Sequence, residues 1–148
     1  MQITKATQAD IKPIVALNRQ FHLDIPGFRW DTEAWVRDQV DKGTFHLLKD
    51  GSSAYGAVCI QTALDNLPST DAYIETIATR EDLHGQGYGR ELINQAALIA
   101  RDEGKTRLIV ESFTEYGLKG FYTKCGFQLE SEKSDFGGHP YNVFTMEI

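Results

Sequence analysis

Apolar and polar positions follow two different periods along the chain, and the changes of period predict its elements. Apolar residues recurring every three to four positions predict helices, and short apolar runs between turn residues predict strands. The predicted strands cover residues 1–7, 44–49, 54–63, 72–79, 107–111, 127–130 and 141–148. The predicted helices cover residues 8–18, 31–42, 88–103 and 118–125. The predicted order is therefore βααβββαβαββ.

Local turn and cap residues delimit several of these elements. Pro26-Gly27 interrupts the first helix, and Asp31-Thr32-Glu33 is typical of a helix N-cap. Gly43 ends that second helix, and Gly104 ends the helix over residues 88–103. Asp50-Gly51 between two apolar runs predicts a β-hairpin.

This order predicts an α/β fold, a mixed (α+β) sheet with helices on both faces. A chain of 148 residues fits a single domain over residues 1–148, without an internal repeat or linker. Hydrophobic residues at 41% and charged residues at 24% exclude collagen-like, low-complexity and disordered classes. We therefore expect one core that needs no disulfide or metal.

Charge and composition limit the classes of partner that the protein can bind. A net charge of −6 argues against a nucleic-acid surface and mildly favours a cationic partner. The apolar runs, such as residues 96–100, are too short for a membrane helix, and the N-terminus lacks the apolar core of a signal peptide. We therefore predict a cytoplasmic protein without a membrane partner. Cys59 and Cys125 lack disulfide or zinc spacing, and four scattered histidines predict no metal.

A glycine-rich turn joins a predicted strand to the helix with the broadest apolar stripe. After residues 74–79 and a short loop, the sequence reads His84-Gly85-Gln86-Gly87-Tyr88-Gly89-Arg90. Glycines allow close backbone approach, and the amides and dipole of a helix start attract anions. The turn predicts a pyrophosphate site, with a purely structural turn as the alternative.

Two other phosphate-binding motifs do not fit. The chain has no G-x-x-x-x-G-K-[ST] run, and Gly85-x-Gly87-x-Gly89 lacks the period of the dinucleotide motif G-x-G-x-x-G.

Three spaced segments together resemble the GCN5-related N-acetyltransferase (GNAT) superfamily. Its cofactor motif, Q/R-x-x-G-x-G/A, is similar to His84-x-x-Gly87-x-Gly89. Its fourth strand is similar to Ile74-Glu75-x-Ile77-x-Thr79, and its F-Y-x-K-x-G-F segment to Phe121-Tyr122-x-Lys124-x-Gly126-Phe127. The departures are His84 in place of Arg or Gln, and Glu115 and Leu118 in place of Asn and Ala.

The resemblance implies acetyl-CoA as cosubstrate. It places the pyrophosphate on the amides of residues 85–90 and the pantetheine arm along the strand, with an oxyanion donor near Ile77 or Ala78. The implied cofactor-binding residues are Ile77, Ala78, Thr79, His84, Gly85, Gln86, Gly87, Tyr88, Gly89 and Arg90.

Two residues are candidates for proton transfer. Glu75 lies mid-strand among apolar residues, where a raised pKa would suit a base or a water relay; the alternative is a solvated or structurally paired carboxylate. Tyr122 matches the general acid of the family, and its place on an apolar stripe equally fits a core residue.

The resemblance also places an acceptor pocket between the first two helices. The residues there are His22, Asp24, Phe28, Trp30 and Trp35. Aromatic rings and the carboxylates of Asp24, Asp31 and Glu33 would suit a cationic amine, with Trp35 as a core residue the alternative. His139 and Tyr141 border Phe136-Gly137-Gly138, which predicts either a lid or an ordinary hairpin.

The resemblance implies an N-acetyltransferase that moves acetyl from acetyl-CoA to a primary amine of a small molecule or peptide. The alternatives are a non-catalytic acyl-CoA-binding sensor or interaction module on the same fold, and an unrelated phosphate-binding protein. The sequence also allows a homodimer.

Overall fold

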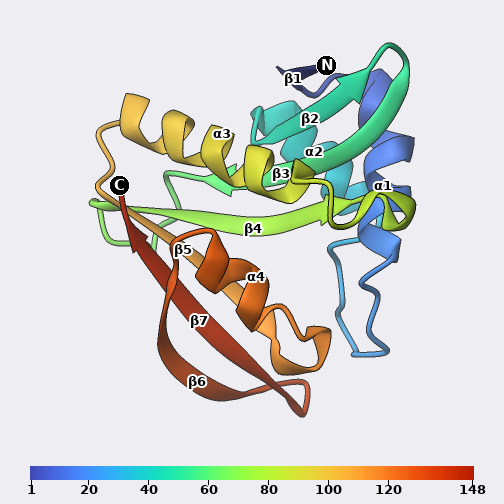
Figure 1. Cartoon of the computed structure of the whole chain (residues 1–148). Coiled ribbons are helices and arrows are strands. Elements are labelled where there is room, and N and C mark those ends of the chain that lie inside the picture. The colour runs from blue at the N-terminus through green and yellow to red at the C-terminus, as the bar shows by residue number, and fades with distance from the viewer. The chain divides into compact units, whose positions relative to one another are not determined.

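The computed structural model contains the strands and helices in the predicted order (Figure 1). It describes the backbone of residues 1–148 and every side chain except that of Ser134. The strands are β1 (Gln2–Lys5), β2 (Phe45–Asp50), β3 (Ser53–Gln61), β4 (Asp71–Thr79), β5 (Arg107–Phe113), β6 (Gln128–Phe136) and β7 (His139–Glu147). The helices are α1 (Ile11–Arg19), α2 (Glu33–Lys42), α3 (Tyr88–Asp102) and α4 (Lys119–Lys124). Short 3-10 turns are η1 (Gln8–Asp10), η2 (Glu81–Leu83) and η3 (Thr114–Tyr116).

The chain divides into two compact units. The first consists of residues 1–60 and 76–96, and the second of residues 61–75 and 97–148. Strand pairs are antiparallel among β1, β2 and β3, parallel between β4 and β5, and antiparallel among β5, β7 and β6. The predicted α/β fold with a mixed sheet is therefore confirmed.

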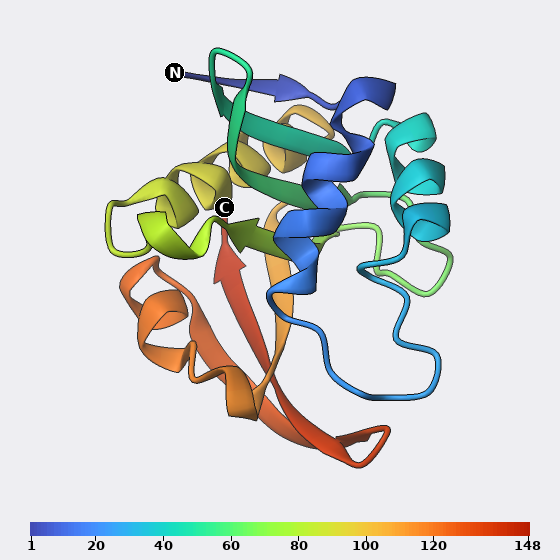
Figure 2. The same cartoon turned by 90° about the vertical axis from the view of Figure 1, so that its right-hand side faces the viewer.

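The first unit carries helices on both faces of its strands. Alternate buried residues of β2 and β3, including Phe45, Leu47 and Ala57, share one hydrophobic cluster with α1 and α2. Gly56 is adjacent to Ala57 in β3, so it lies on the opposite face of the strands. A Cβ built on Gly56 would lie 2.8 Å from Cδ1 of Leu92 in α3. Figure 2 shows α1 and α2 beside β2 and β3.

Local signals fix the ends of α2 and the first hairpin as predicted. The Oγ1 of Thr32 accepts a hydrogen bond from the Trp35 amide at 3.3 Å, and Gly43 ends the helix at φ +77°. Asp50 pairs with Ser53 across Gly51, which confirms the predicted hairpin.

In the second unit, β4 pairs with β5 from Asp71–Arg107 to Ile74–Val110. The strand β6 is longer than the predicted residues 127–130, because Gly137-Gly138 turns at positive φ and lets Phe136 pair with His139. Its additional residues, such as Glu132 and Lys133, are exposed and polar, so they carry no apolar alternation.

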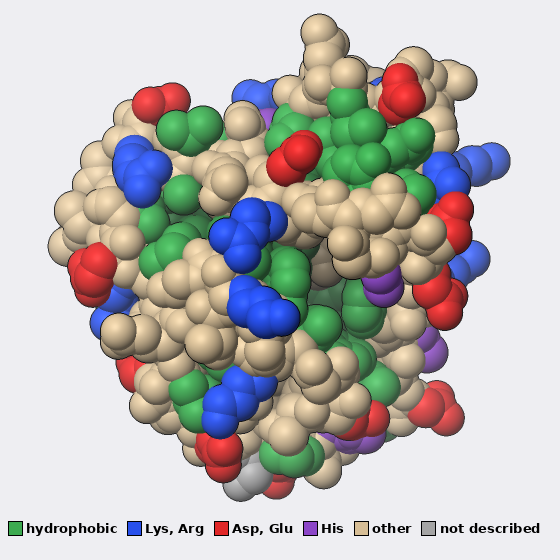
Figure 3. Space-filling view, in the orientation of Figure 1, with side chains coloured by type: hydrophobic (Ala, Val, Ile, Leu, Met, Phe, Trp, Pro, Cys, Tyr) green, Lys and Arg blue, Asp and Glu red, His purple; other side chains and the backbone are tan. Residues whose placement is uncertain are grey.

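Charged side chains of both signs occur on the face drawn in Figure 3. Among the described residues, no helix combines the length and the apolar composition that crossing a membrane requires.

Candidate functional site

The glycine turn of the first unit leaves the start of α3 open. The first hydrogen bond of α3 runs from the Glu91 amide to the Gly87 carbonyl at 3.1 Å. The amides of Tyr88, Gly89 and Arg90 come before it, so they have no carbonyl partner within the helix. Gly85 and Gly87 have φ of +83° and +88°, a backbone conformation that favours glycine. A Cβ built on either glycine would meet no atom within 4 Å. Main-chain donors and open space thus occur together at the positive end of a helix dipole.

The carbonyl of Thr79, at the end of β4, already accepts two hydrogen bonds. The Thr79 oxygen lies 3.0 Å from Nε2 of Gln20 and 3.2 Å from Nε2 of His84. A carbonyl oxygen has two lone pairs, so these two donors fill its capacity. A pantetheine amide would have to displace one of them there. Neighbouring Ala78 is buried in the core, and Ile77 is half-buried.

Arg80 braces the beginning of the turn. Its guanidinium binds the Asp82 carboxylate through Nε at 3.0 Å and Nη2 at 2.7 Å, and its Nη1 donates to Oγ of Ser53 at 3.0 Å. It also lies 5.3 Å from the centroid of the Tyr55 ring, which contacts Tyr88 edge-on. The hydrogen bonds from Arg80 lower the pKa of Asp82. These contacts hold the loop between β4 and α3, and sequence reasoning missed them.

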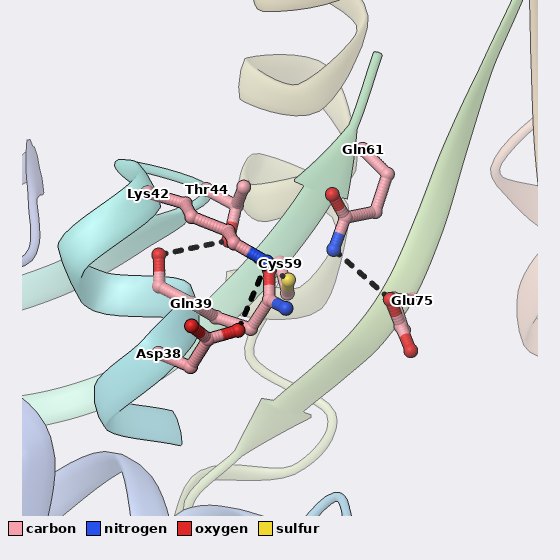
Figure 4. A network of polar contacts seen from close by, with 7 residues as sticks. All are labelled: Asp38, Gln39, Lys42, Thr44, Cys59, Gln61 and Glu75. Atoms are coloured by element: carbon pink, nitrogen blue, oxygen red, sulfur yellow. Dashed lines mark hydrogen bonds and ion pairs between the residues drawn. The ribbon is translucent and has the colours of Figure 1, made fainter. Parts of the chain in front are cut away.

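Glu75 lies in the second unit, directly after the β4 residues that pair with β5. Its Oε1 accepts a hydrogen bond from Nε2 of Gln61 at 3.0 Å (Figure 4). The carboxylate is half-buried and oriented by an amide. Such a partner suits a positioned base and equally a structural pair, so its catalytic role stays a prediction.

Cys59, also drawn in Figure 4, makes polar contacts in the first unit. Its Sγ lies 3.3 Å from Oγ1 of Thr44, which in turn lies 2.9 Å from Oε1 of Gln39. Cys59 is fully buried, and Cys125 is only half-buried.

Tyr122 is 2% exposed in the second unit. Its ring packs 5.1 Å from Phe144 and 5.6 Å from Phe127, centroid to centroid. Burial raises the pKa of its phenol, so the hydroxyl keeps its proton at neutral pH. The core position is observed, and the role as acid stays a prediction.

Several side chains that were predicted to bind the acceptor, in and next to the segment between α1 and α2, are paired with other side chains of the protein. His22 binds Asp31 through Nδ1 at 2.6 Å, and Glu33 binds Arg37 at 2.7 Å. The guanidinium of Arg29 lies 4.7 Å from the centroid of Trp30, so it occupies an aromatic face predicted for a substrate cation. Trp35 packs against Phe45 at the edge of the core, the alternative that the sequence left open.

The hairpin between β6 and β7 is tied to η3. His139 binds Glu115 through Nδ1, and its ring lies 6.0 Å from that of Phe113. The segment is therefore a hairpin with a side-chain anchor, and a lid role stays a prediction. Among the side chains that the structure describes, no three His, Cys, Asp or Glu residues are grouped to hold a metal ion.

The model of the acetyltransferase (GNAT) family matches residues 14–127, and the chain belongs to this family. Ard1 from Thermoplasma volcanium has a similar structure, with a TM-score of 0.80 and 18% identity over 99% of this chain and 97% of that one. Rv2747 from Mycobacterium tuberculosis, solved with CoA and NLQ, has a TM-score of 0.79 and 15% identity over 100% of this chain and 99% of that one. The ribosomal-protein-S18-alanine N-acetyltransferase from Escherichia coli has a TM-score of 0.75 and 18% identity over 99% of this chain and 93% of that one. At these identities the likeness shows the fold, and the search of curated proteins found no match.

Proposed function

We propose that this chain is an N-acetyltransferase that moves the acetyl group of acetyl-CoA to a primary amine of a small molecule or peptide. The observation that carries the proposal is the glycine turn directly before α3, where a Cβ built on Gly85 or Gly87 would meet no atom within 4 Å and the first hydrogen bond of the helix begins only at the Glu91 amide. Membership of the acetyltransferase family supports it, as do the CoA-bound relative and the N-acetyltransferase among the solved structures.

The proposed pyrophosphate ligands are the main-chain amides of the turn, with Ile77 to Thr79 beside the pantetheine arm. The residues fit such a group because donor-only amides at a helix start suit an anion. The proposed cofactor-binding set is Ile77, Ala78, Thr79, His84, Gly85, Gln86, Gly87, Tyr88, Gly89 and Arg90.

The proposed reaction needs three proton transfers. An alkyl ammonium with a pKa of about 10.4 must lose a proton before its nitrogen can attack, and we assign this step to Glu75, directly or through water. The C–N bond then forms at the thioester carbonyl, and an amide near Ile77 or Ala78 stabilises the oxyanion. Breakage of the C–S bond releases a thiolate with a pKa of about 8.5, which takes the proton of Tyr122, and the nitrogen gives its second proton to the resulting phenolate, directly or through water, as the amide forms.

A non-catalytic acyl-CoA sensor is the second candidate. It is favoured by His84 and Glu115, which depart from the family pattern and are engaged by Thr79 and His139. Both candidates bind acetyl-CoA, so release of free thiol in the presence of an amine decides between them. We further propose a cytoplasmic single-domain protein, monomeric or homodimeric, that binds no nucleic acid.

Gly87→Glu tests the binding site. The carboxylate would enter the open space and repel the pyrophosphate, so we expect loss of acetyl-CoA binding by calorimetry. Gly104→Glu is the matched control, because Gly104 has φ +77° and equally open surroundings at the other end of α3. Retained affinity in Gly87→Glu would overturn the assignment of the turn.

A further inference from the structure

His84 begins the glycine turn, and one hydrogen bond fixes its ring. The Nε2 atom lies 3.2 Å from the carbonyl oxygen of Thr79. A carbonyl oxygen can only accept, so Nε2 carries a proton and donates it. In the neutral imidazole Nδ1 then has no proton, and it becomes a donor only when the ring takes up a second one. The contact with Thr79 therefore makes the donor capacity of Nδ1 depend on protonation.

Nδ1 is open to a ligand. The His84 side chain is exposed, and among the described residues its only side-chain hydrogen bond is the one from Nε2 to Thr79. Nδ1 is the ring nitrogen nearer the main chain, which continues directly into Gly85 and Gly87. A Cβ built on either glycine would meet no atom within 4 Å. The nitrogen thus adjoins the segment proposed to bind the pyrophosphate.

His84 can keep its bond to Thr79 when the pantetheine arm binds. Gln20 is the other donor to this carbonyl, at 3.0 Å, and its Nε2 also donates to the Leu17 carbonyl at 2.7 Å. Gln20 can therefore release Thr79 and keep the shorter of its two bonds. His84 has no second acceptor among the described residues, so Gln20 is the donor that we expect a pantetheine amide to displace.

The charges around His84 are largely compensated before an anion binds. Asp82 lies within electrostatic range, and its pKa is lowered mainly by hydrogen bonds from Arg80 and to a smaller extent by the charge of His84. Because Arg80 already pairs with Asp82 through two nitrogens, this carboxylate adds little net charge. The other charged side chains of the adjoining elements are exposed and screened by solvent, namely Arg19 of α1, Glu81 of η2, and Arg90 and Glu91 of α3. A bound pyrophosphate adds negative charge, which favours the charged form of an imidazole beside it.

We propose that His84 is a proton-linked ligand of the cofactor, whose Nδ1–H donates to the pyrophosphate only in the imidazolium form, so that acetyl-CoA binding takes up a proton and weakens as the pH rises through neutrality. This inference rests on the proposed function. The family motif has Arg or Gln at this position. Arg keeps its charge and Gln has none, so of the three residues only His makes the contact depend on pH.

The test measures the affinity for dephospho-CoA by calorimetry between about pH 5.5 and 7.5. Dephospho-CoA keeps the pyrophosphate but lacks the 3′-phosphate, whose own ionisation near about pH 6 would imitate the effect. We expect Kd to rise about fivefold from the lowest to the highest pH, as for a hydrogen bond to an anion that loses its charge at an exposed site. Uptake of a single proton limits the change to about tenfold per pH unit.

Two further readouts follow the proton itself. Titrations at about pH 7 in two non-phosphate buffers of different ionisation enthalpy give the number of protons taken up with the ligand, which we expect to be a fraction of one. Imidazole ¹⁵N chemical shifts should show a proton on Nε2 alone in the free protein at about pH 7.5. Saturation with dephospho-CoA at about pH 6.5 should show protons on both nitrogens of His84.

Three variants connect the pH dependence to this residue. His84→Gln has no titratable ring, and its Kd should match that of the wild type at about pH 7.5 throughout the range. His84→Arg keeps the charge, and its Kd should stay within about threefold of that of the wild type at about pH 5.5. His139→Gln is the matched control, because this histidine is also held through its ring, by Glu115, and belongs to the second unit. It should keep the pH dependence of the wild type.

A wild-type Kd that changes by less than about twofold over this range would overturn the inference, while the cofactor site stands. A pH dependence that survives in His84→Gln would overturn it too, as would a free protein with the proton on Nδ1. Absence of binding of both dephospho-CoA and acetyl-CoA at every pH is a different result, which contradicts the proposed function and the inference with it.

Discussion

Tyr122 and His46 are both buried titratable residues, and burial keeps both neutral through opposite shifts. Removing water disfavours the charged form of any group, which raises the pKa of an acid and lowers that of a base. The pKa of Tyr122 is raised accordingly. The pKa of His46 in β2 is lowered, first by burial and then by the positive charge of Lys5. Tyr122 therefore keeps its proton, and His46 is protonated less readily than an exposed histidine.

Tyr122→Phe should lower the rate of thiol release while leaving acetyl-CoA affinity nearly unchanged. General acids contribute about 10²–10⁴-fold, and we expect the low end, about 10²-fold, because a raised pKa makes the phenol a weaker donor. Stopped-assay kcat and calorimetric Kd are the measurements. Tyr73→Phe, another tyrosine of the second unit, is the control, and an unchanged kcat in Tyr122→Phe would refute the acid role.

His46 should make the protein sensitive to mild acid. Its folded-state pKa lies below the ordinary histidine pKa of about 6.5, so below that pH the unfolded chain binds a proton that the folded chain does not bind. The free energy of unfolding then falls as the pH falls, by up to about 1.4 kcal/mol per pH unit. Urea unfolding between about pH 7.5 and 5.5 measures this slope. His46→Leu should flatten it, and identical slopes would contradict the assignment.

At the scale of elements, the features predicted from the sequence are those with local causes. Thr32 and Gly43 cap α2 as expected, because a cap depends only on residues within one turn. The length of β6 was not predictable, since its exposed edge residues lack apolar alternation. The close approach of Gly56 to α3 depends on tertiary packing, and no neighbouring residue signals it.

Gly56→Ala should destabilise the first unit. The added Cβ would lie 2.8 Å from Leu92 Cδ1 and 3.0 Å from the Ala78 carbonyl, and the backbone atom cannot rotate away. Overpacking of this kind costs about 1–3 kcal/mol. Chemical unfolding midpoints check it. Gly120→Ala in α4 is the control, because its Cβ meets nothing within 4 Å and alanine favours a helix; equal midpoints would contradict the prediction.

The candidate site shows the same division between local and distant causes. The glycine turn was predicted because its letters, its conformation and its helix start are contiguous. The bonds from Gln20 to Thr79 and from Gln61 to Glu75 join residues 59 and 14 positions apart, and no pattern marks them.

At the scale of the molecule, the proposed roles are divided between the two units. The amides proposed for the pyrophosphate belong to the first, and Glu75 and Tyr122 to the second. The single-domain expectation rests on length and element order, and it stays a prediction. The boundary falls within β3, β4 and α3, so continuous elements belong to both units.

Acetyl-CoA should therefore raise the melting temperature of the whole chain. A ligand that binds only the folded state, at 100 times its Kd, adds about 2.7 kcal/mol, or roughly 5–10 °C for a protein of this size. Differential scanning calorimetry with acetyl-CoA, CoA and inorganic pyrophosphate measures the shift. Acetyl-CoA and CoA should act alike if the turn holds their common pyrophosphate, and Gly87→Glu should abolish both shifts. A shift with pyrophosphate and none with CoA would contradict the proposed acetyl-CoA site, because the pantetheine arm would then have no place on β4.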